Sequence, residues 1–90
     1  MRNPVYSGQF KRDLKAAKKR GKDMDKIKRL MRLLIECEPL PPEYKDHPLK
    51  GQLRSFRDAH IEPDWLLIYT IEGEGVRFER TGRHTDLFDE

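Results

Sequence analysis

The apolar run at residues 65–71 narrows the choice of fold more than any other feature of this 90-residue chain. If the run is a β-strand, its two faces carry Trp65, Leu67, Tyr69 and Ile71 on one side and Leu66, Ile68 and Thr70 on the other. A strand that is apolar on both faces needs cover on both, so we expect it at the centre of a sheet. Residues 52–60 and 76–81 are the predicted neighbouring strands, and a tight reversal at Gly73-Glu74-Gly75 precedes the last one.

Two amphipathic helices are predicted before the sheet. Ser7 is a suitable N-cap for the first helix, which ends at Gly21. Asp23 is a suitable N-cap for the second helix, which Pro39 stops beyond Glu38. Apolar residues recur at helical spacing in both, namely Phe10, Leu14 and Ala17, then Met24, Ile27, Met31 and Leu34. So little chain separates the helices that they should form an antiparallel hairpin.

With a very short strand at residues 5–6, these elements predict one α+β domain over residues 1–90, in which the helical hairpin packs on one face of an antiparallel sheet. Residues 39–51 are predicted to be a long loop without regular structure. A loop of that length in a compact domain tends to be functional or disordered. Tyr44, His47 and Leu49 argue against disorder.

The charge of the chain is divided unevenly. Residues 1–35 contain 12 Lys and Arg against 3 Asp and Glu, a charge of +9, and residues 36–90 contain 7 against 13, a charge of −6, which together give +3. The basic half points to a polyanion or an acidic protein as partner, although solvated helices explain it equally well. The lone Cys37 suits a reducing cytoplasm, and no apolar run approaches membrane-spanning length. We therefore expect a cytoplasmic protein with no membrane partner.

The chemically active side chains gather at the ends of the predicted strands. Residues 58–65 place three carboxylates, an imidazole and an indole around one proline, a composition that alone is typical of a hairpin turn. Of the three histidines, His47 lies in the predicted loop, His60 at the end of the strand at residues 52–60, and His84 just past the strand at residues 76–81. In an antiparallel meander the strand ends that carry His60, Asp64 and His84 share one end of the sheet, so these groups should converge. His47 can fold over them from the long loop.

Three kinds of chemistry use such groups. The first is metal binding, because imidazole and carboxylate groups are zinc ligands, but the spacing of these residues in the sequence matches no metal-binding motif. A protein nucleophile is the second kind, but Ser55 and Cys37 lie in the wrong parts of the chain. In the third, an RNA 2′-hydroxyl is the nucleophile, and histidine and carboxylate groups take its proton and deliver one to the 5′-oxygen. Arg80, Arg57 and Arg83 are candidates to neutralise charge on the phosphate.

Aromatic residues near the predicted site also suit RNA. Trp65 or Phe88 is a candidate to stack on a splayed base, although Trp65 is explained equally well as a core residue. A basic helical face would hold the larger nucleic acid. Cleavage of RNA is therefore one joint explanation for the histidines, the aromatics and the uneven charge.

Several short motifs in fixed order resemble the YafQ toxins of the RelE superfamily over essentially the whole chain. They are Tyr6-Ser7-Gly8-Gln9-Phe10, Lys22-Asp23-Met24, Tyr44-Lys45-Asp46-His47-Pro48-Leu49, Arg57-Asp58-Ala59-His60, Pro63-Asp64-Trp65, Phe78-Glu79-Arg80-Thr81-Gly82 and His84. The ordered set is specific, whereas no single motif is.

The resemblance implies a bacterial type II toxin that enters the ribosomal A site and cuts the mRNA codon there, without a metal or other cofactor. The expected products are a 2′,3′-cyclic phosphate and a 5′-hydroxyl. The implied partners are a cognate antitoxin, the 70S ribosome with its mRNA, and operator DNA only for the toxin–antitoxin complex. By the same resemblance, the catalytic positions are His47, His60, Asp64 and His84, supported by Trp65, Phe88, Asp58 and Arg80.

Two other functions remain open at this point. One is a ParE-like toxin that inhibits DNA gyrase without being a nuclease, and the other is a plain RNA- or ribosome-binding module. The histidine cluster favours the nuclease, because a gyrase inhibitor has no need of it.

Overall fold

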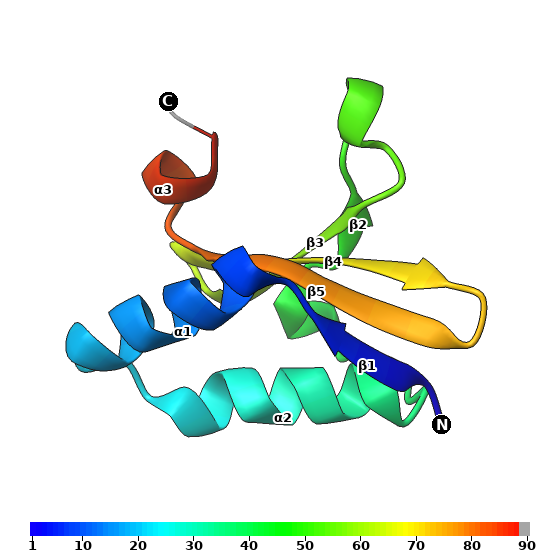
Figure 1. The fold of residues 1–90 in the computed structure, drawn as a ribbon, viewed down its shortest axis with the longest axis horizontal. Coiled ribbons are helices and arrows are strands. Elements are labelled where there is room, and N and C mark those ends of the chain that lie inside the picture. Colours follow the sequence, from blue (N-terminus) through cyan, green and yellow to red (C-terminus); the bar gives the residue numbers. More distant parts are fainter. Residues whose placement is uncertain (89–90) are drawn as a thin grey trace.

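The computed structural model describes residues 1–88, and Asp89 and Glu90 lie outside the described part. One sheet runs through the molecule in the order β1-β5-β4-β3-β2 (Figure 1). Its strands are β1 (Asn3–Tyr6), β2 (His47–Pro48), β3 (Arg57–Glu62), β4 (Trp65–Glu72) and β5 (Gly75–Gly82). The doubly apolar run forms β4 and lies in the middle, as its pattern predicts. The neighbouring pairs β2–β3, β3–β4 and β4–β5 are antiparallel.

One strand departs from the predicted antiparallel sheet. β1 pairs with β5 in parallel, with Asn3 opposite Gly75 and Tyr6 opposite Phe78. Two helices and three strands separate β1 from β5 in the chain, so the connection is long enough for either direction. The apolar pattern shows which residues face the core but does not show the direction of a strand, so it did not reveal the parallel pair.

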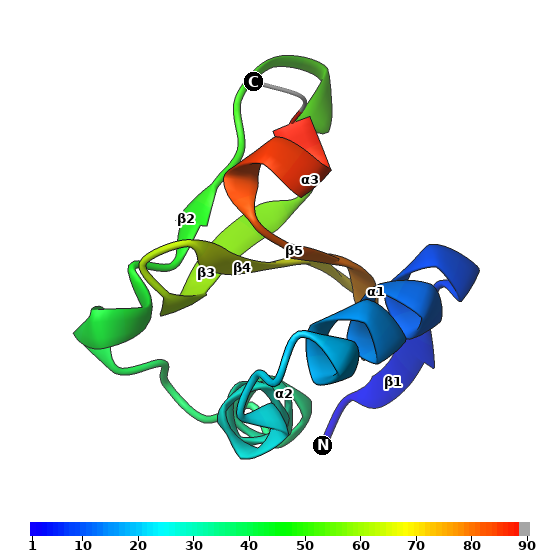
Figure 2. The same cartoon turned by 90° about the vertical axis from the view of Figure 1, so that its left-hand side faces the viewer.

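Helices α1 (Gly8–Lys19) and α2 (Met24–Ile35) both lie on one face of the sheet and run in opposite directions (Figures 1 and 2). The predicted caps are both present. The Ser7 hydroxyl accepts from the Phe10 N–H at 2.9 Å and donates to the Glu79 carbonyl at 2.6 Å, so the cap also ties α1 to β5. Asp23 accepts from the Asp25 N–H at the start of α2.

The second helix is shorter than predicted. It ends at Ile35, and Cys37 has the left-handed backbone conformation, with φ of 60°. The N–H of Glu38 then donates to the Leu33 carbonyl at 2.9 Å, which closes the last turn. The chain has therefore left the helix before it reaches Pro39.

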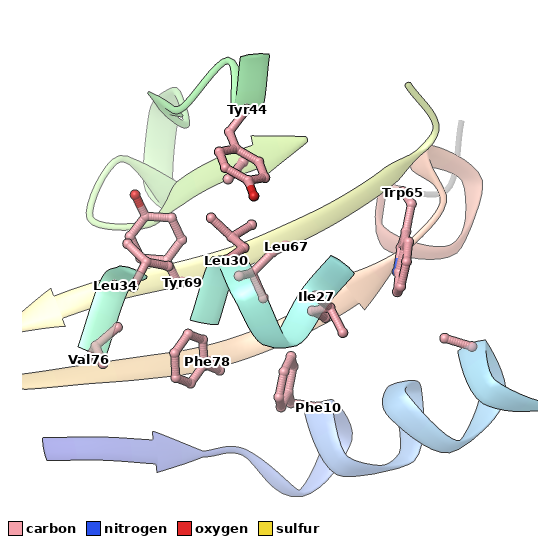
Figure 3. Packing of buried hydrophobic residues seen from close by; sticks show 12 residues of the cluster. Phe10, Ile27, Leu30, Leu34, Tyr44, Trp65, Leu67, Tyr69, Val76 and Phe78 are labelled. Atoms are coloured by element: carbon pink, nitrogen blue, oxygen red, sulfur yellow. The ribbon is translucent and has the colours of Figure 1, made fainter. Parts of the chain in front are cut away.

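The core fills the space between the helices and the sheet (Figure 3). Its side chains come from both helices and from the facing side of the strands: Phe10, Ile27, Leu30, Leu34, Trp65, Leu67, Tyr69, Val76 and Phe78. Each of them is at most 4 % exposed. The apolar residues predicted for the helices and for one face of β4 therefore meet in one cluster, except for Ile71 near the end of β4, which is 38 % exposed.

The segment predicted as an irregular loop contains short regular pieces. They are a 3₁₀ turn η1 (Pro42–Tyr44), strand β2, and a second 3₁₀ turn η2 (Gly51–Leu53). The predicted strand at 52–60 is wrong in its first half, because η2 occupies that part and β3 begins only at Arg57. Gly51 has φ of 68°, a left-handed conformation that reverses the chain there.

Two short projections stand on the sheet face opposite α1 and α2. One is the turn that carries η2, and the other is α3 (His84–Phe88), and Figure 2 shows both on the same side of the sheet. The backbone N–H of Leu49 donates to the Phe56 carbonyl at 3.0 Å and closes the base of the first projection. This face, and not the face under the helices, carries the histidines.

Candidate active site

The strand pairing places the functional side chains on that open face. His47 of β2 lies opposite Asp58 of β3, and Asp58 lies opposite Ile68 of β4. Cross-strand partners point to the same side of a sheet, and residues two apart on one strand do so as well. His60 therefore shares the face with Asp58. The sheet itself, rather than a mobile loop, aims these groups.

Asp58 lies between two imidazoles. Its carboxylate oxygens are 3.8 Å from His47 Nε2 and 3.6 Å from His60 Nε2, and the centroids of the two rings are 6.0 Å apart. The His84 ring is also 6.0 Å from the His60 ring, in an edge-on orientation. The predicted convergence of His60, Asp64 and His84 is thus observed, and His47 belongs to the same group.

Asp58 is in an unfavourable environment for a carboxylate. It is 4 % exposed, and its Oδ1 has no hydrogen-bond partner among residues 1–88. Burial raises the pKa of Asp58, and the nearby imidazoles of His60, His47 and His84 offset part of the effect. A buried carboxylate oxygen without a hydrogen-bond partner attracts any proton that an adjacent imidazole carries. Asp58 is therefore suited to stabilise a charged histidine during proton transfer.

His47 is held in one orientation by the backbone. Its Nδ1 is 2.7 Å from the Lys45 carbonyl oxygen, which only accepts hydrogen bonds. The proton of the neutral ring is therefore on Nδ1, and Nε2 faces Asp58 with a lone pair. When the ring becomes charged, the second proton appears on Nε2, beside the carboxylate.

Asp64 orients His84. Its Oδ1 accepts the His84 backbone N–H at 3.0 Å and the ring at Nδ1 at 2.7 Å. The hydrogen bond from the His84 backbone, followed by that from its ring, lowers the pKa of Asp64. Because Nδ1 donates to a carboxylate that stays ionised, His84 Nε2 is left for a substrate. Asp64 was predicted to transfer protons, but its geometry is that of a positioning residue.

The arginines predicted to contact phosphate are all engaged within the chain. Arg80 pairs with Asp13 of α1 at 2.8 Å, Arg57 pairs with Asp46 and Arg83 with Asp86. Arg80 is opposite Ile68 in the sheet, so it lies on the site's face but one strand beyond the histidines. In this conformation these three guanidinium groups face carboxylates of the chain itself.

The two aromatic candidates have different positions. Phe88 on α3 has its ring centroid 6.4 Å from that of His84 and is only half-buried, so it remains a candidate to stack on a base. Trp65 is 0 % exposed and packs in the core, with the Lys22 ammonium 5.7 Å from its ring centroid. The core interpretation of Trp65 is therefore the correct one, and the stacking role proposed for it is wrong for this conformation.

Asp58 was predicted only as a supporting residue, although it lies between His47 and His60. The signal was present in the order Arg57-Asp58-Ala59-His60, because alternate residues on a strand share a face.

His47, Asp58 and His60 also have the arrangement of a metal site. Each offers one ligand atom, and these atoms all lie within 4.8 Å of one another. Two imidazoles and a carboxylate are ligands that zinc and copper accept. The same three groups cannot bind a metal and exchange protons with a substrate at the same time.

In the part of the chain that the structure describes, no helix has the length and apolar character needed to cross a bilayer.

Comparison with known proteins identifies the family. Residues 2–89 match the family described as the bacterial toxin of type II toxin-antitoxin systems, YafQ. The chain belongs to this family. It is 57 % identical over 88 residues to the mRNA interferase toxin YafQ of Escherichia coli (strain K12), an alignment that covers 97 % of this chain and 96 % of the relative.

Solved structures agree with this assignment. A crystal structure of the E. coli DinJ–YafQ complex contains a chain that is 56 % identical, with a TM-score of 0.91 and coverage of 98 % of this chain and 99 % of that one. A metal-bound toxin from Helicobacter pylori is 40 % identical, with a TM-score of 0.91 and coverage of 98 % and 100 %. The predicted family and the predicted α+β RelE-like fold are both confirmed.

Proposed function

We propose that this mRNA interferase toxin of the YafQ family cuts RNA by attack of a 2′-hydroxyl on the adjacent phosphate. The observation that supports the proposal best is the pair of carboxylate–histidine units, Asp58 with His47 and His60, and Asp64 with His84. Cleavage of this kind needs one group to remove a proton and another to donate one, on opposite sides of the phosphate. Two oriented imidazole units about 6 Å apart satisfy that need.

The chemistry requires no protein nucleophile. The 2′-oxygen forms a bond to phosphorus as its proton passes to one imidazole, and the bond from phosphorus to the 5′-oxygen breaks as another imidazole protonates that oxygen. The products are a 2′,3′-cyclic phosphate and a 5′-hydroxyl. His60 and His84 are the proposed proton-transfer residues, and Asp64 holds His84 in position. His47 is proposed to offset the negative charge of the phosphate, and Asp58 is proposed to offset the positive charge that forms on His60.

Metal independence is part of the proposal. In the reaction described above, every proton movement is assigned to a side chain, so no bound ion is required to activate water or a leaving group. The metal-bound H. pylori relative shows that a similar chain accepts an ion. In this protein an ion at His47, Asp58 and His60 would occupy the lone pairs that the reaction uses.

The proposed partners follow from the family and from the charge. The E. coli relative forms a complex with DinJ, and we propose that a cognate antitoxin neutralises this chain in the cytoplasm in the same way. The basic residues of α1 and α2 are proposed to bind ribosomal RNA, an acidic antitoxin segment, or both. Operator DNA is proposed as a partner of the toxin–antitoxin complex only.

One experiment tests the function. The purified protein is added to an mRNA in a translating extract, and new 5′ ends are mapped by primer extension. We expect cuts in the codon occupying the A site, which disappear when ribosomes are removed. A matched reaction with purified DNA gyrase measures the alternative activity. Intact mRNA together with inhibited gyrase would refute the proposal.

A further inference from the structure

An apolar cavity of about 250 Å³ lies beside the histidines, on the same face of the sheet. The turn that carries η2 forms one wall and α3 forms the other, the two projections that Figure 2 shows above the sheet. Its apolar lining consists of Leu49, Leu53, Phe56, Ile68, Leu87 and Phe88, and we call it the apolar pocket. None of the proton-transfer steps proposed above uses it.

The apolar pocket lies next to the proposed reaction centre. Its floor, Ile68, is the direct cross-strand partner of Asp58. One wall ends at Phe88, whose ring centroid is 6.4 Å from that of His84. The other wall begins at Leu49, two residues after His47. A nucleotide with its phosphate at the histidines therefore has this pocket within reach of its base.

The chemistry of the lining fits a flat, uncharged ring. Phe56 and Phe88 offer aromatic surfaces, and the leucines and Ile68 offer apolar contact. Glu79 and Arg80 at the margin supply hydrogen-bonding groups for the edge of a base, although they also pair with Arg77 and Asp13. A phosphate would find no free donor in such a lining, so the pocket does not suit the RNA backbone.

We propose that the apolar pocket binds one nucleobase of the mRNA next to the phosphodiester that is cut, and that it thereby sets the codon preference. The inference rests on the proposed nuclease function and adds the specificity site to it. Phe88 stacks on the base from the side of α3, and Leu53 and Phe56 close over it from the side of η2. Each base fills the cavity to a different extent, so the rate of cleavage depends on the base at that codon position.

Leu53 is the residue to change, because its side chain is 47 % exposed and makes little contribution to the core. Leu53→Glu places a negative charge at the mouth of the pocket, and Leu53→Trp fills the mouth without a charge. Val5→Glu is the matched control, since Val5 is also 47 % exposed but lies on β1, away from the site. Binding of the cognate antitoxin and the thermal midpoint show that each variant is folded.

The test uses purified ribosomes with mRNAs that present each codon in the A site, and the rate of cleavage is measured for each. We expect both Leu53 variants to reduce kcat/KM at the favoured codons by about tenfold or more and to alter the ratios between bases at one codon position. Val5→Glu should change neither. Leu53 variants that lower all rates by one common factor, or that lose only antitoxin binding, would overturn the proposal.

The experiment distinguishes a failure of the proposed nuclease function from a failure of the proposed base-binding pocket. A wild-type protein that cuts no mRNA on ribosomes overturns the nuclease function and this inference with it. A wild-type protein that cuts, combined with Leu53 variants whose codon preference is unchanged, overturns the specificity site alone.

Discussion

Replacing Asp58 with asparagine should make the protein more stable and less active. The carboxylate is 4 % exposed, its Oδ1 has no partner within residues 1–88, and the nearest imidazole nitrogens are 3.6 and 3.8 Å away, beyond good hydrogen-bond distance. A buried polar group without a partner costs about 1–3 kcal/mol. The asparagine side chain has nearly the same shape as the aspartate side chain but carries no charge. We expect a gain of about 1 kcal/mol, at the lower end because the imidazoles already offset part of the cost.

The pH dependence follows from the direction of the pKa shift. Burial raises the pKa of Asp58 above 3.8, so the folded state binds its proton more tightly than the unfolded state does. This stabilisation is complete below about pH 3.8 and is lost as the pH rises through the folded-state pKa. Asp58→Asn should therefore match wild type in acid and exceed it at neutral pH, above the folded-state pKa of Asp58.

Thermal unfolding between pH 3.5 and 8, with a chelator present, measures the difference. A gain of about 1 kcal/mol raises Tm by about 4–8 °C in a domain of this size. Cleavage on ribosomes should fall about 100-fold or more, because a neutral amide no longer stabilises a charged His60 or His47. Asp64→Asn is the matched control, and its Tm at pH 7 should not exceed that of wild type. An Asp58→Asn protein that melts below wild type at pH 7 would refute the reasoning.

Three other perturbations test the site. His84→Ala should reduce cleavage about 10²- to 10⁴-fold while the Tm and antitoxin binding stay unchanged, and primer extension that still shows cuts would contradict the role of His84. Trp65→Ala should lower the free energy of unfolding in urea by about 3–5 kcal/mol, because it empties a core position. Trp65→Phe should keep the rate of cleavage within a few-fold of wild type, and a folded Trp65→Phe protein without activity would instead support a stacking role for Trp65. Zn²⁺ should raise the Tm and inhibit cleavage by wild type but not by His47→Gln, and protein stripped of metal should still cut RNA.

The fold was predictable where apolar residues recur with a clear period. The pattern of residues 65–71 placed β4 at the centre, and the polar caps Ser7 and Asp23 placed both helices. The boundaries that were missed, at Glu38 and at residues 52–56, depend on left-handed backbone at Cys37 and Gly51. A residue type such as cysteine gives no signal for that conformation, because tertiary packing imposes it.

The sequence predicted which residues lie together in the site, but it did not predict the chemical role of each residue. Strand alternation and meander topology bring His60, Asp64 and His84 together without any knowledge of side-chain conformation. The roles depend on burial and on hydrogen-bond partners, which come from distant parts of the chain. Arg80 illustrates the limit, since its partner Asp13 lies 67 residues earlier, on a helix.

The opposite environments of the two carboxylates suggest a division of work between them. Asp64 is exposed and receives two hydrogen bonds from His84, so its pKa is lowered and it stays ionised throughout a reaction at neutral pH. Asp58 is buried and its Oδ1 has no hydrogen-bond partner within residues 1–88, its pKa is raised, and its energy falls whenever a neighbouring histidine gains a proton. Asp64 therefore fixes the orientation of His84, while Asp58 responds to the charge that forms during the reaction. Groups whose pKa values the environment pushes apart commonly divide acid–base roles in this way.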